Sequence, residues 1–177
     1  MADYPPRLAR ERCLADGRRV TIRPIRAGDE PAERQFLDQL SGETRQLRFM
    51  KHASAVNEQL IHFFTHLDYD RHMAFVCEYQ GELVGEARYL ANPDGKSCEF
   101  GVVIADDWRG SGIAGPLMEA LIAAATARGF ETMEGLVLGR NAVMLAFARD
   151  LGFELAAEPR DPSVVRVSRK LRRGDNR

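Results

Sequence analysis

Cysteine is scarce in this sequence, with three among 177 residues. Cys13, Cys77 and Cys98 have no spacing typical of metal ligands, and their odd number argues against a disulfide framework. Cys77 and Cys98 lie in apolar runs. We therefore expect both to be buried, reduced thiols without a catalytic role.

Long apolar runs and an excess of one charge are also missing. No apolar run approaches the roughly 18 residues that a membrane-spanning helix needs. The segment from Met1 to Arg12 lacks the apolar core of a signal peptide. The 25 basic and 26 acidic residues leave a net charge of -1, which gives no electrostatic reason to expect nucleic acid. We therefore expect a cytoplasmic protein that binds neither membranes nor nucleic acid.

The chain has the size and the composition of a single α/β domain, with 45% hydrophobic residues. Its periodicities and turn signals predict the order βααβββαβαββ, in which antiparallel strands precede one β-α-β crossover. This order indicates a mixed sheet of about seven strands with helices on both faces. We expect a partly ordered extension over residues 1–17, one domain over 18–171 and a flexible tail over 172–177.

The predicted elements alternate between short strands and amphipathic helices. Strands are predicted over residues 18–25, 72–79, 81–91, 96–104, 130–138, 153–158 and 163–171. Helices are predicted over residues 27–41, 54–67, 107–129 and 141–152.

The stretch "GSGIAG" contains the pattern G-x-G-x-x-G at Gly110, Gly112 and Gly115. A dinucleotide site needs these glycines directly after the first strand of a βαβαβ unit, but here they come late in the chain. A Walker loop fails because no Lys-Ser/Thr follows the glycines. The sequence therefore favours a different phosphate site, with dinucleotide binding as the weaker alternative.

The same stretch suits an anion on physical grounds. The first turn of a helix has unpaired N–H groups and a positive dipole end, so a pyrophosphate there accepts several hydrogen bonds. Glycine lets the main chain approach the ligand closely, and Arg109 adds a fixed cation. Pro116 lacks an N–H, and the first helical turn is where that lack costs least.

The stretch Arg109-Gly110-Ser111-Gly112-Ile113-Ala114 fits R/Q-x-x-G-x-G/A, the pyrophosphate loop of the GCN5-related N-acetyltransferase (GNAT) superfamily. The chain resembles this superfamily over nearly its whole length. Two further motifs carry the resemblance: the strand Val102-Val103-Ile104 before the loop, and Asn141 followed by Leu151-Gly152-Phe153. "SGETRQLRFM", "THLDYDRHMAFV" and "CEFGVVIADDWRGSGIAG" add a narrower resemblance to the acetyltransferase domain of bacterial protein lysine acetyltransferases.

The resemblance implies a GNAT fold and acetyl-CoA as co-substrate. Arg109, Gly110, Ser111, Gly112, Ile113 and Ala114 would then hold the pyrophosphate, and Val102, Val103 and Ile104 would line the pantetheine arm with main-chain groups. Asn141 would reach the arm from the other side, or else serve as a helix N-cap. The implied acceptor is a primary amine, foremost a protein lysine; a small-molecule amine and a non-catalytic acetyl-CoA-sensing module are the alternatives. A homodimer is also left open.

Acetyl transfer to an ammonium group needs a base. Glu99 is the best candidate, because it lies on the strand that leads to the loop and shares a face with Gly101 and Val103. We expect burial in an apolar strand to raise its pKa; a solvent-facing carboxylate is the alternative. Glu86, on the neighbouring strand, competes for the role, whereas Asp68 and Asp70 are better explained as turn formers.

Three further positions complete the prediction. Ala148 stands where many relatives have a tyrosine that protonates the leaving thiolate, so acid catalysis by a tyrosine at this position is excluded. Arg45 and Arg48 are expected to face the acceptor or the cofactor, or else to lie on a surface helix turn. His62 and His66 have the i, i+4 spacing of a metal pair, but no third ligand is evident, so we expect no metal.

Overall fold

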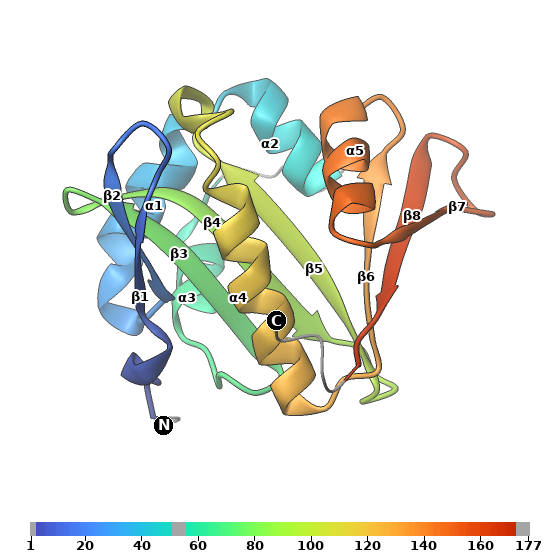
Figure 1. Ribbon diagram of the computed structural model, residues 1–177, viewed down its shortest axis with the longest axis horizontal. Helices are drawn as coiled ribbons and strands as arrows, with labels where there is room; N and C mark the ends of the chain where they lie inside the picture. The colour runs from blue at the N-terminus through green and yellow to red at the C-terminus, as the bar shows by residue number, and fades with distance from the viewer. Residues whose placement is uncertain (1–2, 51–55, 173–177) are drawn as a thin grey trace.

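The computed structural model describes residues 3–50 and 56–172, which form one eight-stranded sheet covered by helices (Figure 1). The strands are β1 (Arg10–Cys13), β2 (Arg19–Pro24), β3 (His72–Tyr79), β4 (Glu82–Ala91), β5 (Ser97–Ile104), β6 (Thr132–Leu138), β7 (Glu154–Ala157) and β8 (Val164–Lys170). The helices are α1 (Glu30–Gln39), α2 (Gly42–Phe49), α3 (Glu58–Thr65), α4 (Ala114–Arg128) and α5 (Ala142–Asp150). Short 3₁₀ turns include Ala27–Asp29 and Asp106–Trp108.

The strand order in the sheet is β1-β2-β3-β4-β5-β6-β8-β7. Every neighbouring pair is antiparallel except β5 and β6, which are parallel and joined by the crossover through α4. The predicted mixed sheet with one β-α-β crossover is therefore confirmed.

Helices cover both faces of the sheet (Figure 1). On one face, α4 buries Leu117, Leu121 and Ala125 completely against a core that Ala148 of α5 also joins. On the opposite face, a second core contains Phe36 and Leu37 of α1 together with side chains of α3. The two faces therefore have separate cores. None of the helices in the described part of the chain is long and apolar enough to span a bilayer.

Two elements were not predicted. β1 lies within the extension expected to be partly ordered, and it pairs with β2 from Arg10↔Ile22 to Cys13↔Arg19. All four of its residues are exposed, as suits an edge strand, so the segment has no apolar alternation to reveal it. The second unpredicted element is α2, of which only Thr44 is buried. The sheet consequently has eight strands rather than about seven, and residues 173–177 of the predicted tail lie outside the described range.

The cysteine prediction is confirmed as far as burial is concerned. Cys77 and Cys98 are free thiols buried in the core, and Cys13 is free and exposed. Burial raises the pKa of Cys77 and of Cys98 to about 12, with a further contribution from nearby carboxylates. Neither thiol has the lowered pKa that a nucleophile needs.

Candidate functional site

The parallel strands β5 and β6 separate part-way along their length. Their pairing runs only from Ser97↔Thr132 to Glu99↔Glu134. Beyond this point β5 continues beside β4 as far as Ile104, and β6 continues beside β8 as far as Leu138. The sheet therefore has a split between residues 100–104 and residues 135–138.

Main-chain groups of β5 face this split. The N–H of Ala105 donates to the carbonyl of Val84 on β4 at 2.9 Å. Because main-chain groups alternate along an antiparallel strand, those of Val103 also face β4. Those of Val102 and Ile104 face the other edge, where no strand pairs with them. Val103 was predicted with its neighbours to contact the cofactor through main-chain groups; its side chain is buried in the core, and its main-chain groups face β4 rather than the split.

The glycine-rich loop lies between the end of β5 and the start of α4. Gly110 and Gly112 have φ angles of +74° and +88°, a backbone conformation that residues other than glycine rarely adopt. Gly115 has an ordinary φ, and a Cβ added to it would meet nothing within 4 Å. In a dinucleotide site the third glycine is needed for close helix–strand packing. That need is absent here, which argues against the dinucleotide alternative.

The loop offers several donors for an anion. At the start of α4 the N–H groups of Ala114 and Gly115 have no acceptor within the helix, whereas Pro116 has no N–H and Leu117 donates to the Ile113 carbonyl. The Ser111 hydroxyl is buried and has no hydrogen-bond partner among residues 3–50 and 56–172. An unpaired buried hydroxyl is costly unless a ligand or water satisfies it. The residues present therefore fit the pyrophosphate group that the resemblance implies.

A carboxylate connects this loop to the start of α2. Asp106 accepts hydrogen bonds from the Ser41 N–H and hydroxyl, both at 2.9 Å, and from the Thr44 hydroxyl at 2.6 Å. Burial alone would raise its pKa, but these hydrogen bonds and the Arg109 charge hold the pKa below its usual value. Arg109 itself donates to the Thr44 hydroxyl. The guanidinium is thereby fixed between α2 and the loop, an arrangement that sequence reasoning missed.

Glu99 lies where β5 and β6 part, as predicted, but its side chain is exposed. The expected burial in an apolar strand is therefore wrong. Even-numbered positions of β5 join the α4 core, whereas Val103 joins the opposite core. Glu99 and Gly101 share the face of Val103, toward α1, α2 and α3.

Next to Glu99 on that face is a buried cluster of charges. Glu86 and Arg88 on β4 are 1% and 2% exposed, and Glu33 on α1 is fully buried. Arg88 donates to both carboxylate oxygens of Glu86, from Nε at 2.6 Å and from Nη2 at 2.5 Å. Its guanidinium also packs 3.7 Å from the centre of the Phe64 ring. This bidentate pair is the type that is stable when buried.

The two carboxylates of the cluster have opposite pKa shifts. Burial, and then the Glu86 charge, raise the pKa of Glu33 well above its usual value and so favour its neutral form. Burial opposes ionisation of Glu86, but Arg88 outweighs it and lowers the Glu86 pKa. Glu86 is thus an ionised partner of Arg88 and poorly suited to accept a proton. Glu86 was predicted as a competing base, and its pairing with Arg88 argues against that role.

Arg48 of α2 lies against the same face of β5. A Cβ at Gly101 would collide with the Arg48 guanidinium, so glycine is what lets the side chain approach the strand. Burial lowers the pKa of Arg48, whereas the charges of Glu86 and Glu99 raise it. Arg48 is half-buried, and its guanidinium lies against β5 near Glu99 rather than extending into solvent.

Other candidates have structural roles. Arg45 donates to the carbonyls of Leu37 and Asp38 at 2.8 and 3.0 Å, so it closes the end of α1. Asp68 accepts hydrogen bonds from three consecutive main-chain N–H groups, which confirms it as a turn former. The Asn141 side chain accepts from the Met144 N–H at 3.2 Å. This bond confirms the N-cap role of Asn141, at the end of β6 across the split.

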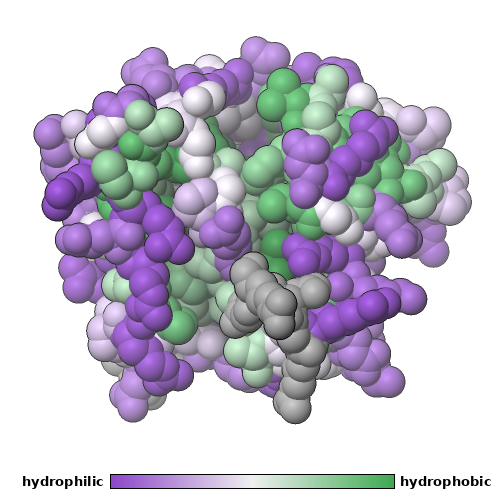
Figure 2. Space-filling view, in the orientation of Figure 1, coloured by the Kyte–Doolittle hydropathy of each residue, from purple (hydrophilic) through white to green (hydrophobic). Residues whose placement is uncertain are grey.

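Apolar side chains gather between α4 and α5 on the face shown in Figure 2. Met144, Leu145 and Phe147 of α5 are partly buried against the core beneath α4. Phe100 follows Glu99, the last residue of β5 that pairs with β6. Its ring centre lies 4.9 Å from that of Phe153. One side of the split is therefore apolar, and its ends carry the loop donors and Glu99.

Comparisons with known proteins agree with this geometry. A match to the acetyltransferase (GNAT) family covers residues 36–153. The acetyltransferase PA5475 of Pseudomonas aeruginosa is 38% identical over 156 residues, which are 86% of this chain and 84% of that protein.

Solved structures give the same result. The GNAT domain of S. lividans PAT has a TM-score of 0.87 at 25% identity, covering 96% of this chain and 100% of that one. RimL, a ribosomal L7/L12 alpha-N-protein acetyltransferase solved with coenzyme A, has a TM-score of 0.69 at 16% identity. That similarity covers 86% of this chain and 94% of RimL, and it concerns the fold alone.

Proposed function

The chain belongs to the acetyltransferase (GNAT) family, and from that premise we propose that it acetylates protein lysines with Glu99 as general base. The family is one of enzymes that move an acetyl group from acetyl-CoA to an amine. The proposal adds the acceptor, the base and the residues that hold the co-substrate.

One observation carries the proposal: the split in the sheet opens beside the glycine-rich loop, with the main-chain groups of Val102 and Ile104 turned into it. We assign the pantetheine arm to this edge. The pyrophosphate then lies on Arg109, Gly110, Ser111, Gly112, Ile113 and Ala114. We assign the other side of the arm to Asn141, the N-cap of α5 just beyond the end of β6. Acetyl-CoA supplies an activated thioester, and the protein supplies position, charge and a proton acceptor.

In the proposed reaction, Glu99 removes a proton from the acceptor ammonium group. The free amine then attacks the thioester carbonyl, the C–S bond breaks, and the thiolate leaves, while the nitrogen of the new amide gives its second proton to water. Ala148 is buried and offers no acid, so water protonates the thiolate. Glu99 suits the role of base because it is exposed at the split, whereas Glu86 is already paired with Arg88.

Exposure of Glu99 also bears on the acceptor. A base that lies open to solvent is accessible to the long side chain of a lysine on a protein surface. The similarity to the GNAT domain of S. lividans PAT supports the same choice.

The test is a panel of lysine peptides, proteins and small amines with acetyl-CoA, read by release of free thiol. We expect protein or peptide lysines to be the best acceptors. Small amines as the best acceptors would contradict the lysine assignment. Acetyl-CoA binding without thiol release from any acceptor would indicate a sensing module instead.

Glu99→Gln tests the base. We expect kcat to fall by about 100-fold or more, the scale of general-base loss, with acetyl-CoA affinity unchanged. The control is Glu82→Gln, an exposed carboxylate at the start of β4, which should leave kcat unchanged. Near-normal kcat in Glu99→Gln would exclude Glu99 as the base.

A further inference from the structure

We propose that Glu30, His62 and His66 form a zinc-binding site on the outer side of α1 and α3. The sequence showed only the histidine pair; the fold brings Glu30, the first residue of α1, beside it. One ligand atom from each residue lies within 4.8 Å of the other two. Imidazole and carboxylate together are a common donor set for Zn²⁺.

The two distances from the Glu30 carboxylate to the histidine nitrogens fit a tetrahedral ion. Glu30 Oε1 lies 3.3 Å from His62 Nδ1 and 3.4 Å from His66 Nδ1. Ligands about 2.0–2.1 Å from a tetrahedral zinc ion lie about 3.3–3.4 Å from one another. A charge-assisted hydrogen bond would be shorter, about 2.7–2.9 Å. The carboxylate oxygen is therefore spaced from both nitrogens as it would be with a shared ion between them.

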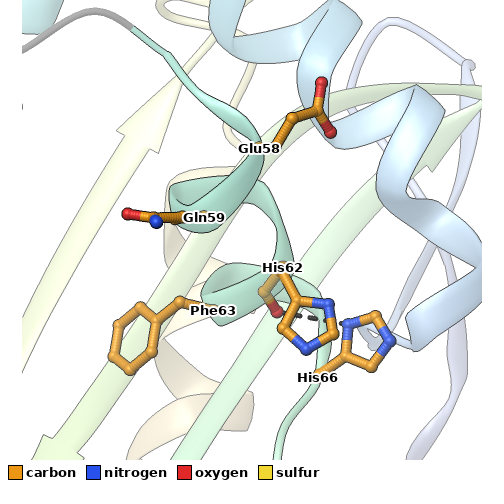
Figure 3. Close-up of a pocket in the computed structure, with 5 residues that line it drawn as sticks. All are labelled: Glu58, Gln59, His62, Phe63 and His66. Carbon is orange, nitrogen blue, oxygen red and sulfur yellow. Dashed lines mark hydrogen bonds between the residues drawn. The ribbon is translucent and has the colours of Figure 1, made fainter.

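The orientation of the side chains supports this interpretation. The two imidazole rings stack with centres 3.7 Å apart, and they point away from Phe63, which projects to the other side of the helix (Figure 3). They line a shallow surface depression together with Glu58, Gln59 and Phe63. His66 Nδ1 contacts the His62 carbonyl at 3.2 Å, and zinc would replace this contact. Three protein ligands leave a fourth position for water.

Such an ion would join the two helices that cover the buried charge cluster. Glu30 lies one turn before Glu33 on α1. On α3, the Phe64 carbonyl accepts hydrogen bonds from Arg88, at 3.4 Å from Nη1 and 3.3 Å from Nη2. Zinc on the outer side would therefore hold α1 against α3 above Glu33, Glu86 and Arg88. We assign it a structural role, distinct from the acetyl-transfer chemistry.

The experiment is calorimetric titration of untagged, chelator-treated protein with zinc chloride, without acetyl-CoA. We expect one equivalent to bind, and the melting temperature to rise as zinc is added. His62→Ala and Glu30→Gln should each weaken binding by at least about tenfold, since even loss of a residue that only orients a ligand costs about 10–100-fold. Both positions are at least partly exposed, so neither change should unfold the protein.

Glu58→Gln is the matched control, because Glu58 borders the same depression but belongs to no ligand trio. It should bind zinc as the unaltered protein does. The proposal is wrong if the unaltered protein takes up no zinc, or if His62→Ala and Glu30→Gln bind it undiminished. It is equally wrong if Glu58→Gln weakens binding as much as Glu30→Gln, since surface charge would then explain the effect. None of these results depends on acetyl transfer.

Discussion

Two glycines control how closely side chains approach the split. At Gly101, the three atoms nearest to an added Cβ all belong to the Arg48 guanidinium, the far end of a flexible side chain. At Gly135, a Cβ would lie 3.0 Å from the Phe100 ring and 3.3 Å from its carbonyl oxygen. A change of the Arg48 rotamer can relieve the contact at Gly101, whereas relief of the contact at Gly135 requires movement of β5 itself.

This difference predicts unequal costs for alanine at the two positions. Gly135→Ala should lower the free energy of unfolding by about 1–3 kcal/mol, as is typical of overpacking. Gly101→Ala should change it by less than about 1 kcal/mol. Urea unfolding of the two variants under the same conditions measures both values. A larger loss in Gly101→Ala than in Gly135→Ala would contradict the described packing.

At the scale of elements, α2 and the glycine-rich loop form one unit through Asp106. Its carboxylate holds Ser41 and Thr44 at the start of α2, and Thr44 in turn accepts from Arg109. The cation proposed to face the pyrophosphate is thus positioned by a helix more than sixty residues earlier in the chain, as the separation of 65 positions between Thr44 and Arg109 shows.

Asp106→Asn should disturb this unit without removing any residue of the loop. We expect a loss of about 1–3 kcal/mol in unfolding free energy, because the buried Thr44 and the exposed Ser41 donors both lose a charged acceptor. Acetyl-CoA should bind more weakly, because Arg109 is no longer fixed. Calorimetry and urea unfolding measure the two effects. Asp107→Asn, at the exposed neighbouring position, serves as the control, and an equal effect there would refute the assigned role of Asp106.

Elements with apolar periodicity were predicted well, and elements without it were not. β3 was predicted over residues 72–79, where it is found, because its residues pack against both cores. β1 was missed because its stability comes from main-chain pairing with β2, which charged, exposed side chains do not reveal. Apolar periodicity in a sequence detects elements that bury one face, so it does not detect an element that is stabilised by main-chain pairing alone.

At the scale of the whole molecule, the buried charges were the least predictable feature. Glu33 stands in the acidic first turn of a helix, where a carboxylate is normally solvated. Its burial depends on Arg88, 55 positions later in the numbering, and on the packing of α1 against β4. The glycine-rich loop and the residues of the split could be predicted from local sequence motifs. The cluster of Glu33, Glu86 and Arg88 could not, because it forms through contacts between residues far apart in the sequence.

The same region should give the molecule a measurable pH dependence. Burial, and then the Arg88 charge, lower the pKa of His72 to about 4, whereas the unfolded chain has about 6.5. Between pH 4 and pH 6.5, His72 is protonated in the unfolded chain but neutral in the folded protein. The free energy of unfolding therefore falls as the pH falls from 6.5 to 4. The His72 contribution is on the order of 3 kcal/mol and is fully present above pH 6.5.

Urea unfolding across this range, compared with His72→Gln, isolates that contribution. The variant should lose less stability than the unaltered protein on acidification from pH 6.5 to pH 4. Parallel pH profiles for the two proteins would mean that His72 is not the group responsible.

The short parallel contact between β5 and β6 has a mechanical consequence. In the described part of the chain, five strands lie on one side of this contact and three on the other, and three residue pairs join them directly. Amide protons on the two sides should therefore exchange with solvent as separate units. A ligand that forms hydrogen bonds to the free edges of both β5 and β6 would connect the two parts of the sheet. Their amide protons should then exchange with solvent as a single unit.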